Sequence, residues 1–137
     1  MDEETRRKKL LEQLDLFVEQ LIDEVPFFVE DLPEFAGKLF DFHQKCPQLL
    51  QIEEWRHRNG LDYPPFAKRV VEEICSEIES AQNEGILPKK FPPRDLFSLI
   101  IKISAIGFDT LPNEIISERS IEKTRKLIVK SVEHLVK

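Results

Sequence analysis

The residues best suited to chemistry lie close together in the middle of the chain. His43 and Cys46 are three residues apart, and His57 follows eleven residues later, with Glu54 beside it. Imidazole and thiolate groups bind zinc, but a zinc site needs three or four ligands, so Glu54 would have to complete the set. The spacing favours two partly buried histidines and a buried cysteine over a metal site. We therefore predict no metal and no cofactor.

Glu54 and His57 also form a Glu-x-x-His pair. Di-iron helical bundles use two such pairs together with two further glutamates. The chain holds only one copy, because Lys130 and Ser131 stand where His134 would need its glutamate. A di-iron centre is therefore not expected.

The same stretch offers opposite charges four residues apart, Glu53 with His57 and Glu54 with Arg58. We expect these to be exposed pairs that each contribute about 0.2–0.5 kcal/mol. The sequence contains no nucleophile elbow, P-loop, dinucleotide fingerprint or His-Glu-x-x-His motif. No catalytic residue is predicted, and we do not expect an enzyme.

The composition suits one folded domain over residues 1–137, since 41% of the residues are hydrophobic and 34% are charged. Acidic residues outnumber basic ones by 26 to 20, so autonomous binding to DNA or RNA is not expected. The longest apolar stretch, residues 96–108, is shorter than the roughly 20 residues that span a bilayer. With two separated cysteines and no secretory signal, we expect a cytoplasmic protein that makes no contact with a membrane.

Apolar residues recur at three- and four-residue steps, and nine prolines mark the boundaries between these segments. Asp31 and Glu34 have the spacing of a capping box, Pro47 separates two helices, and Asn59-Gly60 is a typical helix end. The pattern predicts an all-α fold without a convincing strand. The six predicted helices cover residues 3–24, 31–46, 47–58, 66–84, 94–108 and 114–136.

The fifth predicted helix, residues 94–108, is apolar on nearly every side, and such a helix must be covered on all its faces. Lys102 lies within it and is expected to extend to the surface along its aliphatic stem. The sixth predicted helix carries one apolar stripe. Together these two helices predict a homodimer interface that contains Phe97, Ile100, Ser104, Phe108, Ile121, Ile128 and Leu135.

Residues 39–60 carry a recognisable pattern. Leu39-Phe-Asp-Phe42 is followed by Pro47, Leu49 and Trp55, which is similar to the LFDF-x-x-x-x-P-x-L-x-x-x-x-x-W pattern in the effector-binding domain of the TetR family of bacterial repressors. Residues 78–87 resemble the segment that leads into the last two helices of that family. The resemblance covers most of the chain.

The resemblance implies a six-helix bundle like the TetR C-terminal domain, whose last two helices form a four-helix bundle in the dimer. It also implies a small-molecule cavity between the middle helices and DNA contact through an N-terminal helix-turn-helix domain, which this sequence does not contain. The run Arg6-Arg7-Lys8-Lys9 lies where the helix leaving that domain would be, and we expect it to be a solvated helical turn. The chain is either a piece of a longer regulator or a natural fragment of one.

Aromatic and apolar residues of the middle helices are candidates for the wall of that cavity. The predicted ligand-binding residues are Phe40, His43, Trp55, Phe97 and Ile101, with His43 as the polar contact. The alternative for each is core packing, the usual role of aromatic residues at helical spacing.

The leading interpretation is a ligand-sensing and dimerisation domain of a TetR-like regulator that binds a small, mostly apolar effector. Such an effector would shift the equilibrium between two positions of the first helix. One alternative is a free-standing α-helical interaction module without a pocket. Another is a metal enzyme in a helical bundle.

Overall fold

The computed structural model describes residues 2–106 and 118–137, and in these ranges it is helical and contains no strand. This confirms the predicted all-α fold. Residues 107–117, including Phe108 and the predicted start of the last helix, lie outside the described part of the chain. The helices are α1 (Glu3–Glu24), η1 (Val29–Asp31), α2 (Leu32–Lys45), α3 (Pro47–Arg58), α4 (Pro65–Asn83), α5 (Pro93–Ser104) and α6 (Glu118–Leu135).

Local signals fix most helix ends where the sequence predicts them. The side chain of Asp2 accepts a hydrogen bond from the Thr5 backbone amide at 2.7 Å and caps α1. A proline stands in the first turn of α2, α3, α4 and α5, where its missing N–H leaves no intrahelical bond unmade. Gly60 and Gly85 follow α3 and α4 with φ of 62° and 81°, a conformation that glycine adopts without steric cost.

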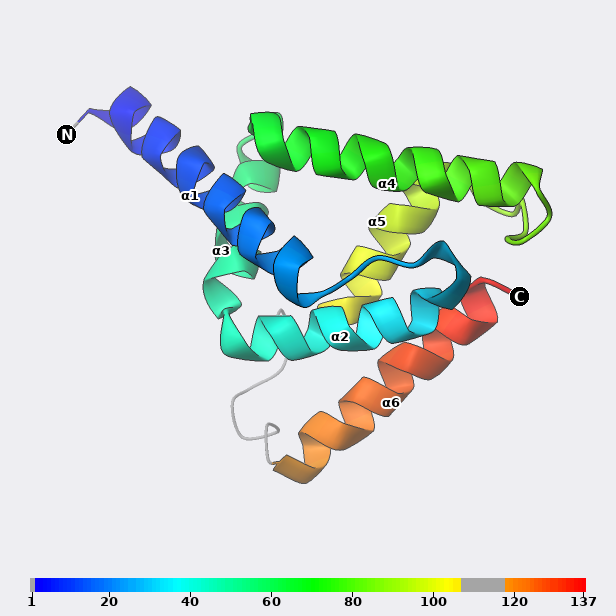
Figure 1. Cartoon of the computed structure of the whole chain (residues 1–137). Coiled ribbons are helices and arrows are strands. Elements are labelled where there is room, and N and C mark those ends of the chain that lie inside the picture. The colour runs from blue at the N-terminus through cyan, green and yellow to red at the C-terminus, as the bar shows by residue number, and fades with distance from the viewer. Residues whose placement is uncertain (1, 107–117) are drawn as a thin grey trace.

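The helices pack around a shared core (Figure 1). In this view α4 and α2 run across opposite sides of the molecule, and α5 crosses between them. Helix α1 contacts α3 and α4, and α5 contacts α2, α4 and α6. The core takes side chains from every α-helix, including Leu14, Leu39, Leu49, Ile78, Ile100 and Ile128.

Helix α6 packs mainly along α2 of the same chain. Gly37 permits this contact, since a Cβ atom there would lie 3.0 Å from both the Arg125 guanidinium and a Val129 methyl group. Nε of Arg125 donates to both carboxylate oxygens of Asp41 at 3.0 and 3.1 Å, and Nη2 donates to Glu34 at 3.2 Å. These ion pairs hold α6 in place across α2.

This packing corrects part of the predicted dimer interface. Ile100, Ser104 and Ile128 are 0% exposed, and the Ser104 hydroxyl donates to the carbonyl of Ile101 at 2.7 Å. These residues are covered within the same chain, because α5 and α6 pack against each other and both pack against α2. These three side chains therefore present no surface to a second copy.

The other predicted interface residues have different positions. Ile121 and Leu135 are half-buried against the core, and Phe97 lies at an interior cavity. Lys102 is exposed, as expected for a lysine that reaches the surface from an apolar helix. None of the described helices combines the length and apolar character needed to cross a membrane.

Candidate functional site

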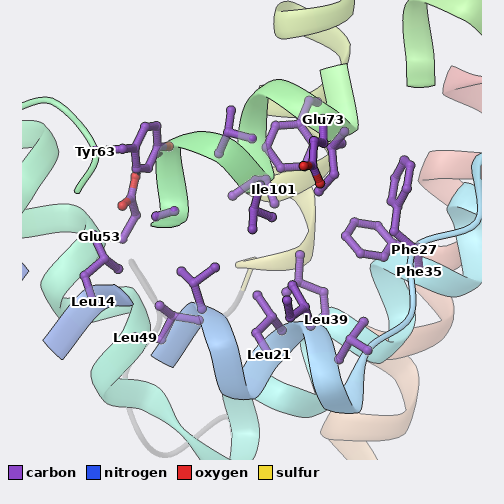
Figure 2. A pocket seen from close by; sticks show the side chains of 18 of the residues that line it. Leu14, Leu21, Phe27, Phe35, Leu39, Leu49, Glu53, Tyr63, Glu73 and Ile101 are labelled. Carbon is purple, nitrogen blue, oxygen red and sulfur yellow. Dashed lines mark hydrogen bonds between the residues drawn. The ribbon is translucent and has the colours of Figure 1, made fainter. Parts of the chain in front are cut away.

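A cavity of about 320 Å³ lies between α1, α2, α3, α4 and α5 (Figure 2). Its volume falls in the roughly 300–1,000 Å³ range of small-molecule sites. Helix α1 contributes one face through residues spaced by three or four positions, which turns them all toward the same side. These residues are Leu14, Val18, Leu21 and Ile22, and Val25 just beyond the helix also lines the cavity.

Helix α4 forms the wall opposite, with Ala67, Val70, Val71 and Ile74. These side chains face inward and border the cavity. Helices α2, α3 and α5 and the connecting segments complete the apolar lining with Phe27, Phe35, Leu39, Leu49, Leu50, Phe97 and Ile101.

The structure brings three of the five predicted ligand-binding residues to the cavity. His43, Phe97 and Ile101 line it, whereas Phe40 is 2% exposed in the core and Trp55 lies elsewhere. Trp55 borders a separate surface hollow between the N-terminal end of α1 and the C-terminal end of α3, together with Glu3, Arg6, Arg7, Leu10 and Asn59. Helical spacing alone does not separate the residues that face the cavity from their neighbours on the same helices.

His43 places an imidazole in an otherwise apolar part of the lining. It is 2% exposed, and burial lowers its pKa to about 4. Its ring packs edge-on against Phe42, with centroids 6.4 Å apart. The imidazole is therefore neutral at neutral pH, and a neutral imidazole carries one N–H donor and one acceptor nitrogen.

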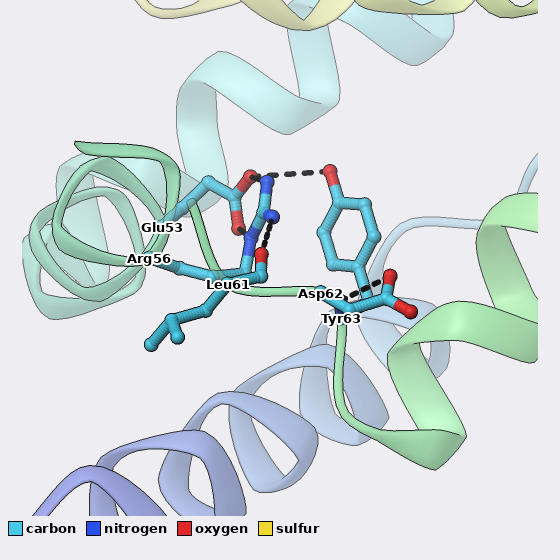
Figure 3. A network of polar contacts seen from close by, with 5 residues as sticks. All are labelled: Glu53, Arg56, Leu61, Asp62 and Tyr63. Carbon is cyan, nitrogen blue, oxygen red and sulfur yellow. Dashed lines mark hydrogen bonds and ion pairs between the residues drawn. The ribbon is translucent and has the colours of Figure 1, made fainter. Parts of the chain in front are cut away.

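A polar network closes one side of the cavity (Figure 3). The Arg56 guanidinium donates to both carboxylate oxygens of Glu53, at 3.0 and 2.6 Å, and the Tyr63 hydroxyl donates to the same carboxylate at 3.1 Å. Arg56 also donates to the carbonyl of Leu61 at 2.6 Å, and its guanidinium carbon lies 3.9 Å from the Tyr63 ring centroid. The network fastens the end of α3 to the segment before α4.

This network corrects the predicted pairing of Glu53 with His57. Glu53 instead turns toward Arg56 and Tyr63, and His57 is exposed. Burial, followed by the neighbouring Glu53 carboxylate, raises the pKa of Tyr63 to about 12, so the phenol keeps its proton as a donor. No local sequence pattern predicts this arrangement, because Tyr63 lies ten residues from Glu53.

Asp15 of α1 caps the start of α4 from a distance of 52 positions in the sequence. Its carboxylate oxygens accept hydrogen bonds from the backbone amides of Ala67 at 2.8 Å and Phe66 at 3.3 Å. The residue that precedes α4, Pro64, supplies no side-chain cap of its own. A carboxylate at this positive helix end satisfies otherwise unpaired donors and links the two opposite walls of the cavity.

The cysteines and histidines do not assemble into a ligand set in the described part of the chain. Within residues 2–106 and 118–137, no group of three or more His, Cys, Asp and Glu side chains is placed to hold a metal ion. Cys46 and Cys75 are buried free thiols, and burial raises the pKa of Cys75.

In the described part of the chain, helices α1 to α5 surround an apolar cavity in an all-helical fold. Residues 31–136 match the sequence model of the family described as "Tetracyclin repressor-like, C-terminal domain". The chain therefore belongs to this family, as its resemblance to TetR proteins predicted. The match supports a regulatory domain.

A solved structure has the same fold. SCO4942 from Streptomyces coelicolor, a proposed transcriptional regulator, aligns with a TM-score of 0.72 and 22% sequence identity. The alignment covers 90% of this chain and 69% of that chain. No curated protein matches the sequence.

Proposed function

We propose that this chain is the effector-sensing and dimerisation domain of a TetR-like bacterial transcriptional regulator, with a small, mostly apolar ligand bound between α1 and α4. The observation that carries the proposal is the apolar cavity of about 320 Å³ in a chain of this family. The alternative of an interaction module without a pocket requires a solid centre, and the cavity argues against it.

The position of α1 supports a signalling role for the cavity. Four residues of α1 line it, and Asp15 ties the same helix to the start of α4. A ligand that fits one spacing of α1 and α4 better than another shifts the equilibrium between them by its difference in affinity. In the proposed regulator, α1 passes this shift to a separate N-terminal helix-turn-helix domain that contacts DNA.

Binding in the cavity is tested with N-phenyl-1-naphthylamine, a neutral dye that fluoresces in apolar surroundings. We expect a saturable increase with the wild-type protein and none with Ile101→Trp, because the larger ring fills the cavity from α5. Leu16→Trp is the matched control, since Leu16 is 58% exposed on α1 and does not line the cavity. Circular dichroism checks that both variants remain helical.

The result that contradicts the proposal is equal dye binding by wild type and Ile101→Trp, or no binding by any of the three. Equal binding would place the dye outside the cavity, and failure of the wild type would mean that the cavity does not accept an apolar molecule of this size.

We still propose a homodimer, but we place its interface on residues of α5 and α6 that neighbour the buried ones. Leu99 and Ile103 of α5 are half-buried, and Ile106 just beyond α5 and Leu127 of α6 are 40% and 55% exposed. We expect light scattering at tens of micromolar to show a dimer, and Leu127→Asp to shift it toward monomer, because a charge in an apolar interface is desolvated at a cost. Leu16→Asp, at a 58% exposed position of α1, is the control. A wild-type monomer would contradict the proposal.

A further inference from the structure

The ionised side chains that line the cavity all carry negative charge. Its lining includes the carboxylates of Glu53, Glu73 and Glu77, and no lysine or arginine. The remaining titratable groups in the lining, His43 and Tyr63, are neutral at neutral pH because burial lowers the pKa of the histidine and raises that of the tyrosine. The field inside the cavity therefore favours positive charge.

Glu53 is already compensated, but the two glutamates of α4 are not. Arg56 holds both oxygens of Glu53. Within the described part of the chain, no ion pair joins Glu73 or Glu77 to a basic side chain. These two residues are four positions apart and exposed, so they form one rim of like charge beside the apolar wall.

Nearby cations on α4 are directed elsewhere. Lys68 pairs with Asp62 at 3.0 Å, and the guanidinium of Arg69 lies 5.9 Å from the Phe66 ring centroid. Figure 2 shows the Glu73 carboxylate extending from α4 among the apolar side chains of the cavity, on the side of the view away from Glu53 and Tyr63. The uncompensated charge is thus separate from the Glu53–Arg56 pair.

We propose that the ligand of this cavity is a lipophilic cation, whose apolar body fills the space between α1 and α4 and whose ammonium group lies between the carboxylates of Glu73 and Glu77. This inference rests on the proposed ligand-sensing function and narrows it to one class of molecule. An anionic amphiphile of the same shape would bring a second negative charge to the rim without a counter-ion. The phenylalanine rings in the lining offer negative faces that also favour a cation.

The test compares three ten-carbon ligands by isothermal titration calorimetry below their micelle concentrations: decyltrimethylammonium, 1-decanol and decanoate. We expect decyltrimethylammonium to bind most tightly and decanoate most weakly. The double variant Glu73→Gln/Glu77→Gln should lose about three- to tenfold in affinity for the cation, as expected for two partly solvated charge pairs, and keep its affinity for 1-decanol. Raising the salt concentration should weaken only the binding of the cation.

Glu79→Gln is the matched control, because Glu79 is an exposed glutamate of α4 that does not line the cavity. It should bind all three ligands as the wild type does. All three positions are exposed, so the substitutions leave the core intact, and circular dichroism verifies this.

The outcomes separate the two proposals. Equal affinity for decyltrimethylammonium and 1-decanol, tighter binding of decanoate, or an unchanged affinity of the double variant for the cation would overturn the inference while the apolar cavity kept its proposed role. Failure of all three ligands and of the neutral dye to bind would overturn both.

Discussion

At the scale of single residues, His43 shows how burial sets the chemistry of a side chain. Its folded pKa of about 4 lies below the ordinary value of 6.5, and the cause is burial. The unfolded chain therefore binds a proton at this position more readily than the folded chain does. The stabilisation that follows is complete above pH 6.5 and is lost as the pH falls from 6.5 toward 4.

This shift predicts a specific pH dependence of stability. Between pH 7.5 and pH 5, protonation at His43 should lower the free energy of unfolding by about 2 kcal/mol, which urea unfolding at the two pH values measures. His43→Gln should lose this part of the pH dependence. His134→Gln, which changes an exposed histidine of α6, is the control. The account of His43 fails if the buried and exposed variants show the same pH dependence.

At the scale of helices, polar contacts join the elements around the cavity. Asp15 joins α1 to α4, Arg125 joins α6 to α2, and Gln82 donates from α4 to the carbonyls of Pro88 and Phe91 in the segment before α5. Gln82 is 6% exposed, so these bonds also satisfy a buried amide. Each of these contacts joins two elements. Apolar packing alone would permit the two elements to slide against each other.

The cap by Asp15 can be tested through its effect on stability. Asp15→Ala should lower the free energy of unfolding by about 1 kcal/mol, the usual cost of removing a helix cap, in urea denaturation. Asp23→Ala, at an exposed position of the same helix, is the control and should change stability by less than about 0.5 kcal/mol. Equal stability of Asp15→Ala and the wild type would show that the cap does not hold α1 against α4.

At the scale of the whole molecule, the sequence predicted the elements better than the surfaces between them. Prolines and the glycines at positions 60 and 85 act locally, so the ends of α1, α3 and α4 were found within one residue. Which side of α5 and α6 is covered by the same chain depends on tertiary packing. An apolar stripe indicates that a helix face is covered but not what covers it. For this reason the sequence predicts a dimer contact for Ile100 and Ile128, whereas both lie in the core of the same chain.

The sequence predicted the candidate site only in part. Family resemblance and helical spacing pointed to the middle helices and to His43, Phe97 and Ile101. They could not reveal that α1 forms a whole wall, since its stripe suits a filled core equally well. Nor does the sequence show that two glutamates of α4, Glu73 and Glu77, lie at the edge of the apolar cavity.

The most direct test of the central claim is to locate a bound apolar ligand by nuclear Overhauser effects from N-phenyl-1-naphthylamine to isotope-labelled methyl groups. The account predicts contacts with the methyl groups of Val18, Val71 and Ile101, which face the cavity from α1, α4 and α5. Contacts confined to exposed methyl groups, such as those of Leu16 and Leu127, would contradict it.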